Sequence, residues 1–167
     1  QLTSLDVSQN TALTQIHLSD NQLTSLDVSQ NTALNYLICD NNQITNLDLT
    51  NNPALTLLAC NNNQLSSLDL RNGSNINLQY PNMYENPNLN CISVDDASWA
   101  SANWPVVVYQ HQQISGSIDA HTSFSDDCAN FNLATAWTGA VDTNWNDAGN
   151  WSAGIPDSTD DIIISGG

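Results

Sequence analysis

Residues 2–22, 23–43 and 44–64 read LTSLDVSQNTALTQIHLSDNQ, LTSLDVSQNTALNYLICDNNQ and ITNLDLTNNPALTLLACNNNQ. They are three copies of one 21-residue pattern, and a fourth copy, LSSLDLRNGSNINLQY, begins at Leu65 and decays after Arg71. The recurring apolar positions are Leu5, Leu26, Leu47 and Leu68, then Val7, Val28, Leu49 and Leu70, then Leu13, Leu34 and Leu55, and finally Ile16, Leu37 and Leu58. A fixed period of this length predicts stacked coils that cover one another's apolar residues.

One half of each copy predicts a short β-strand followed by a turn. The run Leu13-x-x-Ile16-x-Leu18-x-x-Asn21-x-Leu23 is the leucine-rich-repeat consensus. Its alternation sends residues 16 and 18 inward and residues 15, 17 and 19 outward. The asparagines at the turn are expected to satisfy backbone groups that no sheet partner reaches, and they recur as Asn21, Asn42 and Asn63.

The other half of each copy predicts a second short extended segment on the opposite, convex wall. It carries another asparagine series, Asn10, Asn31 and Asn52, and an outward aspartate series, Asp6, Asp27, Asp48 and Asp69. Stacked carboxylates repel, so each needs a local partner such as a backbone N–H. A calcium ladder is the alternative, although calcium requires several converging oxygens. The pattern predicts a mainly β, right-handed solenoid with a parallel sheet on its concave face.

Two cysteines, Cys39 and Cys60, replace Leu18 in the second and third copies. Side chains that point the same way from parallel neighbours rarely reach the separation that a disulfide requires. We therefore predict a buried ladder of free thiols that behave as small apolar side chains.

The composition excludes several functions. The chain has 17 acidic residues against one basic residue, Arg71, and a net charge of −16, which repels nucleic acids and anionic membranes. It contains no nucleophile-elbow, phosphate-loop or dinucleotide motif. His17, His111 and His121 fit no metal-ligand spacing and are expected at the surface. We expect no enzymatic activity, no cofactor and no membrane insertion; calcium bound at Asp126 and Asp127 is the alternative to a chain without a metal.

The exposed face of the predicted sheet is the expected contact surface, because it is broad and can vary without disturbing the core. An apolar patch within it would suit a protein or glycan ligand, whereas single exposed apolar residues are ordinary. The residues predicted to bind are Gln15, His17, Tyr36, Ile38, Asp40, Leu57, Ala59 and Asn61.

Residues 1 to 90 resemble the short-repeat, internalin-type family of bacterial surface proteins, which includes a member with a cysteine ladder, and the secreted leucine-rich-repeat proteins of Bacteroidetes. The resemblance implies a secreted or outer-surface protein. The segment around Cys91 and Cys128 looks like the cap that closes such solenoids. A bond between these cysteines would restrain a long loop in an extracellular chain, holding a strand-poor cap over the last coil.

The tail carries tryptophans at Trp137, Trp145 and Trp151 and resembles the opening of β-rich domains in large bacterial surface proteins. They are expected to clamp that domain, with stacking on sugar rings as the alternative. We predict a solenoid over 1–85, a disulfide-linked cap over 86–132 and the start of a Trp-rich β domain over 133–167. The chain is expected to be a fragment, because it opens within a repeat and ends in a strand-like run.

Two functions follow from these features. The first is an extracellular binding or adhesion module, for which the resemblance implies export by a type IX-like secretion machinery. The second is a non-catalytic accessory or stalk region of a larger secreted enzyme acting on polysaccharide. A catalytic domain elsewhere in the gene would favour the second.

Overall fold

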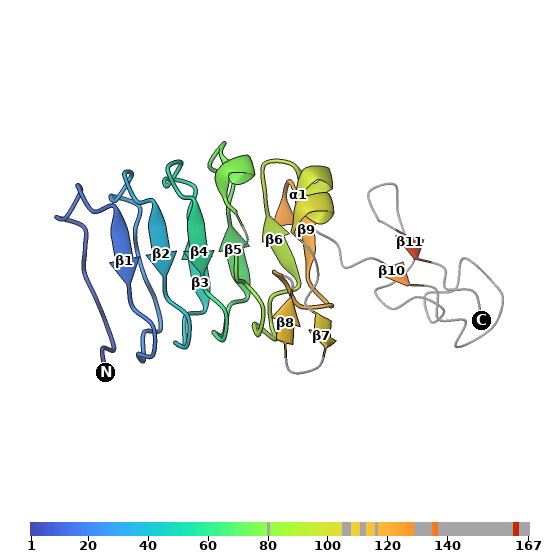
Figure 1. The fold of residues 1–167 in the computed structure, drawn as a ribbon, viewed down its shortest axis with the longest axis horizontal. Helices are drawn as coiled ribbons and strands as arrows, with labels where there is room; N and C mark the ends of the chain where they lie inside the picture. The colour runs from blue at the N-terminus through green and yellow to red at the C-terminus, as the bar shows by residue number, and fades with distance from the viewer. Residues whose placement is uncertain are drawn as a thin grey trace. The chain divides into compact units, whose positions relative to one another are not determined.

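The computed structural model describes residues 1–79, 81–104, 108–110, 113–115, 117–128, 135–136 and 162–163. The chain divides into two units, Gln1–Cys128 and Ala129–Gly167. The first unit is a leucine-rich-repeat β-solenoid whose coils lie side by side in chain order (Figure 1). None of the helices among the described residues could span a lipid bilayer.

The first sheet consists of one strand from each of the first three coils. Its strands β1 (Gln15–His17), β2 (Tyr36–Ile38) and β4 (Leu57–Ala59) are parallel and adjacent in that order. Leu37 pairs with Ile16 on one side and with Leu58 on the other. This register confirms the stack that the repeat predicts, and we call the outward surface of these strands the β1–β2–β4 face.

The second sheet is also parallel and includes part of the predicted cap. Its order is β3 (Asn46–Asp48), β5 (Ser67–Asp69), β6 (Cys91–Ser93) and β9 (Ser123–Ser125). The extended segments expected opposite the first sheet thus form strands in the third and fourth copies, as β3 and β5, whereas the corresponding residues of the first two copies form none. The expectation of a strand-poor cap was wrong, because Ile92 continues the inward row of Leu47 and Leu68 and extends the sheet.

Short elements complete the described chain. A 3₁₀ helix, η1 (Asn75–Asn77), lies in the fourth coil, and α1 (Ala97–Asn103) lies between β6 and β9. An antiparallel pair joins β7 (Val108–Gln110) and β8 (Gln113–Ser115). In the second unit, β10 (Thr135–Ala136) pairs in parallel with β11 (Ile162–Ile163). The tryptophans of the tail lie outside the described residues.

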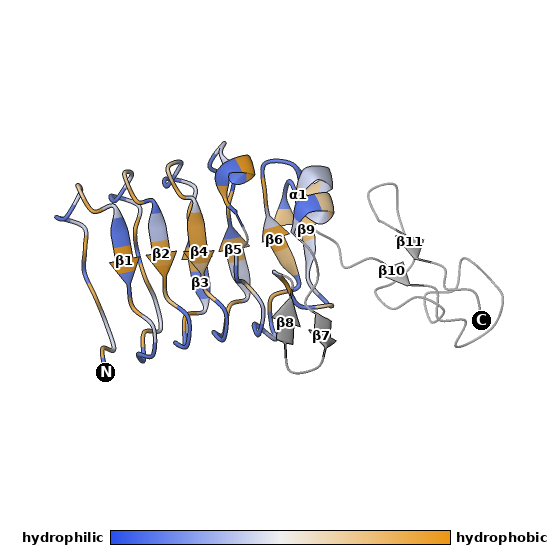
Figure 2. Ribbon diagram, viewed as in Figure 1, coloured by the Kyte–Doolittle hydropathy of each residue, from blue (hydrophilic) through white to orange (hydrophobic). Residues whose placement is uncertain are grey.

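Apolar side chains fill the interior of the coils between the two sheets. In Figure 2 apolar residues recur along the strands, whereas the turns at the lower ends of the coils are hydrophilic. The largest of the fully buried side chains are those of Leu23, Leu34, Leu37, Ile44, Leu47, Leu49, Leu55, Leu58, Leu65, Leu68, Leu70 and Met83. Each buried leucine or isoleucine contributes about 1.5–3 kcal/mol to stability, provided that a neighbouring coil covers it.

Buried asparagines close the turns as the sequence predicts. The Asn42 side-chain amide donates to the carbonyls of Leu18, Cys39 and Asp40 at 2.9–3.1 Å, and its Oδ1 accepts the N–H of Leu23 at 3.0 Å. Asn63 repeats this arrangement one coil further along. The asparagine ladder therefore joins each coil to its neighbours as well as closing its own turn.

The fourth coil continues past the point where the sequence pattern decays. Asn86 takes the next place in the asparagine ladder and donates to the carbonyl of Cys60. Asn63 bonds to the carbonyl of Cys39, which is 24 residues earlier in the sequence, whereas Asn86 bonds to that of Cys60, which is 26 residues earlier. A longer coil, rather than an end of the solenoid, thus explains why the repeat fades after Arg71.

The four cysteines divide as predicted. Cys91 and Cys128 form a disulfide with a Cα–Cα distance of 5.8 Å, which confirms the predicted pair. Cys39 and Cys60 are free thiols and are buried. Burial raises the pKa of the Cys39 thiol to about 12 and that of the Cys60 thiol well above its ordinary value, so neither is a ready nucleophile.

Candidate binding face of the solenoid

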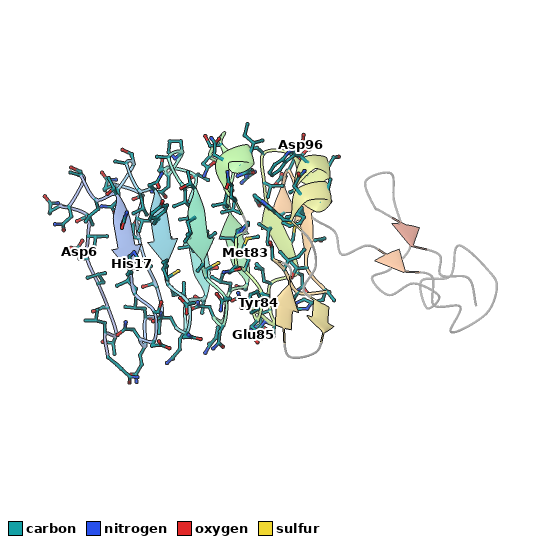
Figure 3. All side chains as sticks on the ribbon, viewed as in Figure 1. Asp6, His17, Met83, Tyr84, Glu85 and Asp96 are labelled. Carbon is teal, nitrogen blue, oxygen red and sulfur yellow. A yellow bond between two sulfur atoms is a disulfide. The ribbon has the colours of Figure 1, made fainter. Side chains whose placement is uncertain are left out.

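The predicted binding residues form two outward rows across β1, β2 and β4 and a turn beyond them. Gln15, Tyr36 and Leu57 are in register in one row, while His17, Ile38 and Ala59 are in register in the other. Gln15, His17 and Tyr36 are exposed, and Ile38 and Leu57 are half-buried. Figure 3 labels His17 on β1. The sequence thus identified a continuous surface.

Ala59 is a correction to this set. Ala59 is only 9% exposed, although it occupies an outward position of β4. Asn82 of the fourth coil pairs beside it in parallel. The small methyl group is covered by its surroundings, so Ala59 offers little surface to a ligand.

Asp40 and Asn61 lie in the turns after their strands and are half-buried. The Asp40 carboxylate accepts the hydroxyl of Ser19 at 2.6 Å and the side-chain amide of Asn41 at 2.9 Å. These bonds tie Asp40 to the preceding coil and to its own turn. It is therefore a structural side chain in the described coils, and it is less available to a partner than Tyr36.

A hollow of about 550 Å³ adjoins the row that contains Tyr36 and Leu57. Its volume is within the range of small-ligand sites. Three successive coils contribute to its lining, which comprises Tyr36, Pro53, Ala54, Thr56, Leu57, Ile76, Asn77 and Gln79. We call this feature the Tyr36 hollow. Its most prominent apolar group is Ile76, which is 70% exposed.

Sequence reasoning missed the part of the hollow that η1 provides. Ile76 is 21 residues after the inward-facing Leu55, so the repeat predicts that Ile76 is buried. In the structure, Leu78 is buried in the fourth coil and Ile76 is exposed. The lengthened coil shifts the register and turns Ile76 outward. The only available signal was the departure of residues 72–77 from the repeat.

Hydrogen bonds between coils hold the walls of the Tyr36 hollow. The carbonyl of Asn35 accepts the N–H groups of Thr56 and Leu57 at 2.9 and 3.2 Å, and the Thr56 carbonyl accepts the N–H of Gln79 at 3.2 Å. The Asn35 side-chain amide also donates to the carbonyl of Ala54 at 2.9 Å. The hollow is therefore built on paired backbone, which preorganises its surface for a ligand.

The lining of the Tyr36 hollow contains no Asp, Glu, His, Lys or Arg. This neutrality contrasts with the net charge of −16 on the whole chain. The acidic series lies elsewhere: in the second sheet, Asp48 of β3 pairs with Asp69 of β5. The hollow is thus an uncharged area on a strongly acidic protein.

Each aspartate of the series has the backbone partner that the sequence predicted. The carboxylates of Asp6, Asp27 and Asp48 accept the N–H two residues further on at 2.9 Å. These bonds to Ser8 and Ser29 hold the pKa of Asp6 and of Asp27 below the usual value. The local bonds stabilise the charged form, which offsets the repulsion between stacked carboxylates.

Asp69 differs in having a guanidinium partner. Arg71 donates to its carboxylate through Nη2 at 2.6 Å, and this side-chain bond holds the pKa of Asp69 below the usual value. Arg71 also lies 3.9 Å from Asp127, while the Asp126 carboxylate accepts the N–H of Ala97. The two calcium candidates therefore already have partners, and calcium binding there stays a prediction.

The histidines are not brought together among the described residues. His17 is on β1, His121 is exposed in the turn before β9, and His111 lies outside the described residues. His121 lines a separate hollow with Glu85 and Asp119. The Asp119 carboxylate accepts the N–H groups of Glu85 and Asn86 at 2.9 Å, which gives it a structural role. In the described part of the chain, no group of three or more His, Cys, Asp or Glu side chains could hold a metal ion.

Comparisons with known proteins found a similar solved structure but no matching family. No family model matches the chain, and no curated protein matches it. The chain is similar to the solved functional domain of InlJ from Listeria monocytogenes, which includes a cysteine ladder. The two sequences are 28% identical, and the TM-score is 0.49. The match covers 73% of this chain and 32% of that one, so this chain spans about a third of the other's length.

Proposed function

We propose that the chain is an extracellular binding module that engages a protein or glycan through the β1–β2–β4 face. The observation that carries the proposal is the Tyr36 hollow, where an exposed aromatic side chain of β2 lies beside apolar groups from a turn and from η1. Contact surfaces of this kind, with apolar anchors surrounded by polar groups, are typical of recognition sites. The solenoid can carry such a surface because its stability comes from the interior of the coils.

The disulfide supports an extracellular location. Disulfides persist in oxidising surroundings, and the bond between Cys91 and Cys128 closes a separation of 37 residues. The high negative charge keeps such a module soluble and away from anionic membranes. Secretion, with a type IX-like route as its means, is part of the proposal.

The test is an array of immobilised extracellular proteins and glycans probed with the purified chain. The double variant Tyr36→Ala/Leu57→Ala is expected to lose binding to whichever spots retain the wild type. The matched control is Asn46→Ala/Ser67→Ala, because these residues are a register pair on the second sheet. Equal binding by the wild type and the Tyr36 and Leu57 variant would contradict the proposed face.

A further inference from the structure

The chemistry of the Tyr36 hollow indicates the class of ligand that it accepts. Tyr36 offers an aromatic surface with 36% of the residue exposed, and Ile76 and Pro53 extend the apolar area beside it. An aromatic ring of this kind packs against flat, partly apolar surfaces. Sugar rings present such a surface, because the C–H groups on one side of the ring are apolar.

Hydrogen-bonding groups lie at the same hollow. Asn77 and Gln79 are exposed, and their side-chain amides form no hydrogen bond with another described residue. An amide presents two donors and an acceptor, which matches a hydroxyl that donates and accepts. The Thr56 hydroxyl, in contrast, already donates to Oδ1 of Asn35 at 3.0 Å. The free amides of Asn77 and Gln79 therefore provide the polar contacts that an apolar surface alone lacks.

Charge selects among the possible ligands. The hollow has no basic side chain to hold a sulfate, phosphate or carboxylate, and a chain with a net charge of −16 repels such groups. It has no carboxylate to hold a basic peptide either. An uncharged ligand with apolar faces and many hydroxyls meets all of these conditions.

From this combination we infer that the Tyr36 hollow binds an uncharged glycan, with one sugar ring stacked on Tyr36 and its hydroxyls bonded to Asn77 and Gln79. The inference rests on the proposed function and names the ligand class for the same face. An open hollow of about 550 Å³ bounded by three coils accommodates a short stretch of such a chain.

The experiment titrates the full chain, labelled with ¹⁵N, with two panels of hexasaccharides. The first panel is uncharged and built from glucose, mannose, galactose or xylose, and the second carries uronic acids or sulfates. At least one uncharged hexasaccharide is expected to shift the amide signals of Tyr36, Leu57 and Ile76. A charged panel that binds as well as or better than the uncharged one would overturn the inference.

Three variants separate stacking from general damage to the surface. Tyr36→Phe keeps the ring and is expected to retain the affinity for the uncharged ligand, whereas Tyr36→Ala is expected to weaken it by about tenfold. The double variant Asn77→Ala/Gln79→Ala is expected to weaken it also. The matched control, Asn46→Ala, changes an exposed residue of β3, which lies on the second sheet and outside the hollow. Wild-type affinity in Tyr36→Ala would overturn the inference.

The two proposals fail in different ways. If no uncharged hexasaccharide shifts these signals while the Tyr36→Ala/Leu57→Ala variant still loses a protein spot on the array, the glycan is the wrong ligand but the face is right. If neither experiment distinguishes that variant from the wild type, the face itself is wrong. Circular dichroism of each variant checks that it keeps the wild-type fold.

Discussion

Individual polar side chains in this solenoid act mainly on the backbone near them. Asp69 accepts both the backbone N–H and the guanidinium of Arg71, which is the single basic residue of the chain. The sequence predicted a partner for each aspartate of the series, because stacked carboxylates repel. It could not predict that Arg71 also reaches the carbonyl of Asp126, since that contact spans 55 residues.

The pair of Asp69 and Arg71 predicts a pH dependence. The pKa of Asp69 is lowered in the folded chain, so the charged carboxylate stabilises the fold above its ordinary pKa of 3.8, and this contribution is lost as the pH falls through the lowered value. Arg71→Gln is expected to reduce the free energy of unfolding slightly at pH 7 and less at pH 2, measured by urea denaturation. In an Asp69→Asn background the Arg71→Gln effect should become smaller, because only the contacts of Arg71 with Asp126 and Asp127 remain; an undiminished effect would exclude the pair with Asp69 as its cause.

The buried thiols predict a difference in reactivity between the folded and unfolded chain. Because Cys39 and Cys60 are buried and their pKa values are raised, neither should react with a thiol reagent at pH 8 in the native state. Both should react in denaturant, and the intact mass should then show two labels while the bond between Cys91 and Cys128 stays closed. Labelling of either thiol in the native state would contradict the burial of the ladder.

At the scale of elements, the periodic part of the fold could be predicted and the departures from the period could not. Leu37 and its neighbours recur at a fixed interval, so their stacking follows from burial alone. The 3₁₀ helix η1 arises from a lengthened coil, and β6 was hidden because the segment that contains it does not repeat. The repeat therefore predicts that Leu57 and Tyr36 lie at the surface, but it does not predict the exposure of Ile76.

The asparagine ladder gives a prediction for the joints between coils. Asn42→Ala removes three donated bonds and one accepted bond in the buried turn, and leaves buried backbone groups unpaired. The free energy of unfolding is expected to fall by about 3 kcal/mol in urea denaturation. Asn51→Ala is the control, because Asn51 is exposed and its side chain bonds to no other described residue. A loss below about 1 kcal/mol at Asn42 would contradict the role of the ladder.

On the scale of the first unit, stability combines repetition with one covalent link. The repeats join neighbour to neighbour, and the Cys91–Cys128 bond connects β6 with the residues after β9. The resemblance to capped solenoids suggested this pairing from the sequence. The strands of the cap could not be foreseen, because Cys91 and Ser123 lie in segments with no shared pattern although they pair in register.

The disulfide predicts a large stability difference between oxidised and reduced forms. A closed loop of 37 residues corresponds to about 4 kcal/mol in the chain-entropy model. The double variant Cys91→Ser/Cys128→Ser is expected to lose about that much in urea denaturation without reductant. Cys39→Ser/Cys60→Ser serves as a comparison that keeps the disulfide. If reductant destabilises the Cys91→Ser/Cys128→Ser variant as much as the wild type, the bond is not the source of the difference.

Successive coils pair strand to strand in a 21-residue register, which leaves the β1–β2–β4 face outward. Scalar couplings across hydrogen bonds, measured by NMR on the ¹³C, ¹⁵N-labelled chain, test it most directly. We expect a coupling between the amide nitrogen of Leu18 and the carbonyl carbon of Ile38, whose hydrogen bond is 2.7 Å long, and a second between the amide nitrogen of Cys39 and the carbonyl carbon of Ala59, whose bond is 2.8 Å long. Couplings from these amides to carbonyls at any other spacing would contradict it.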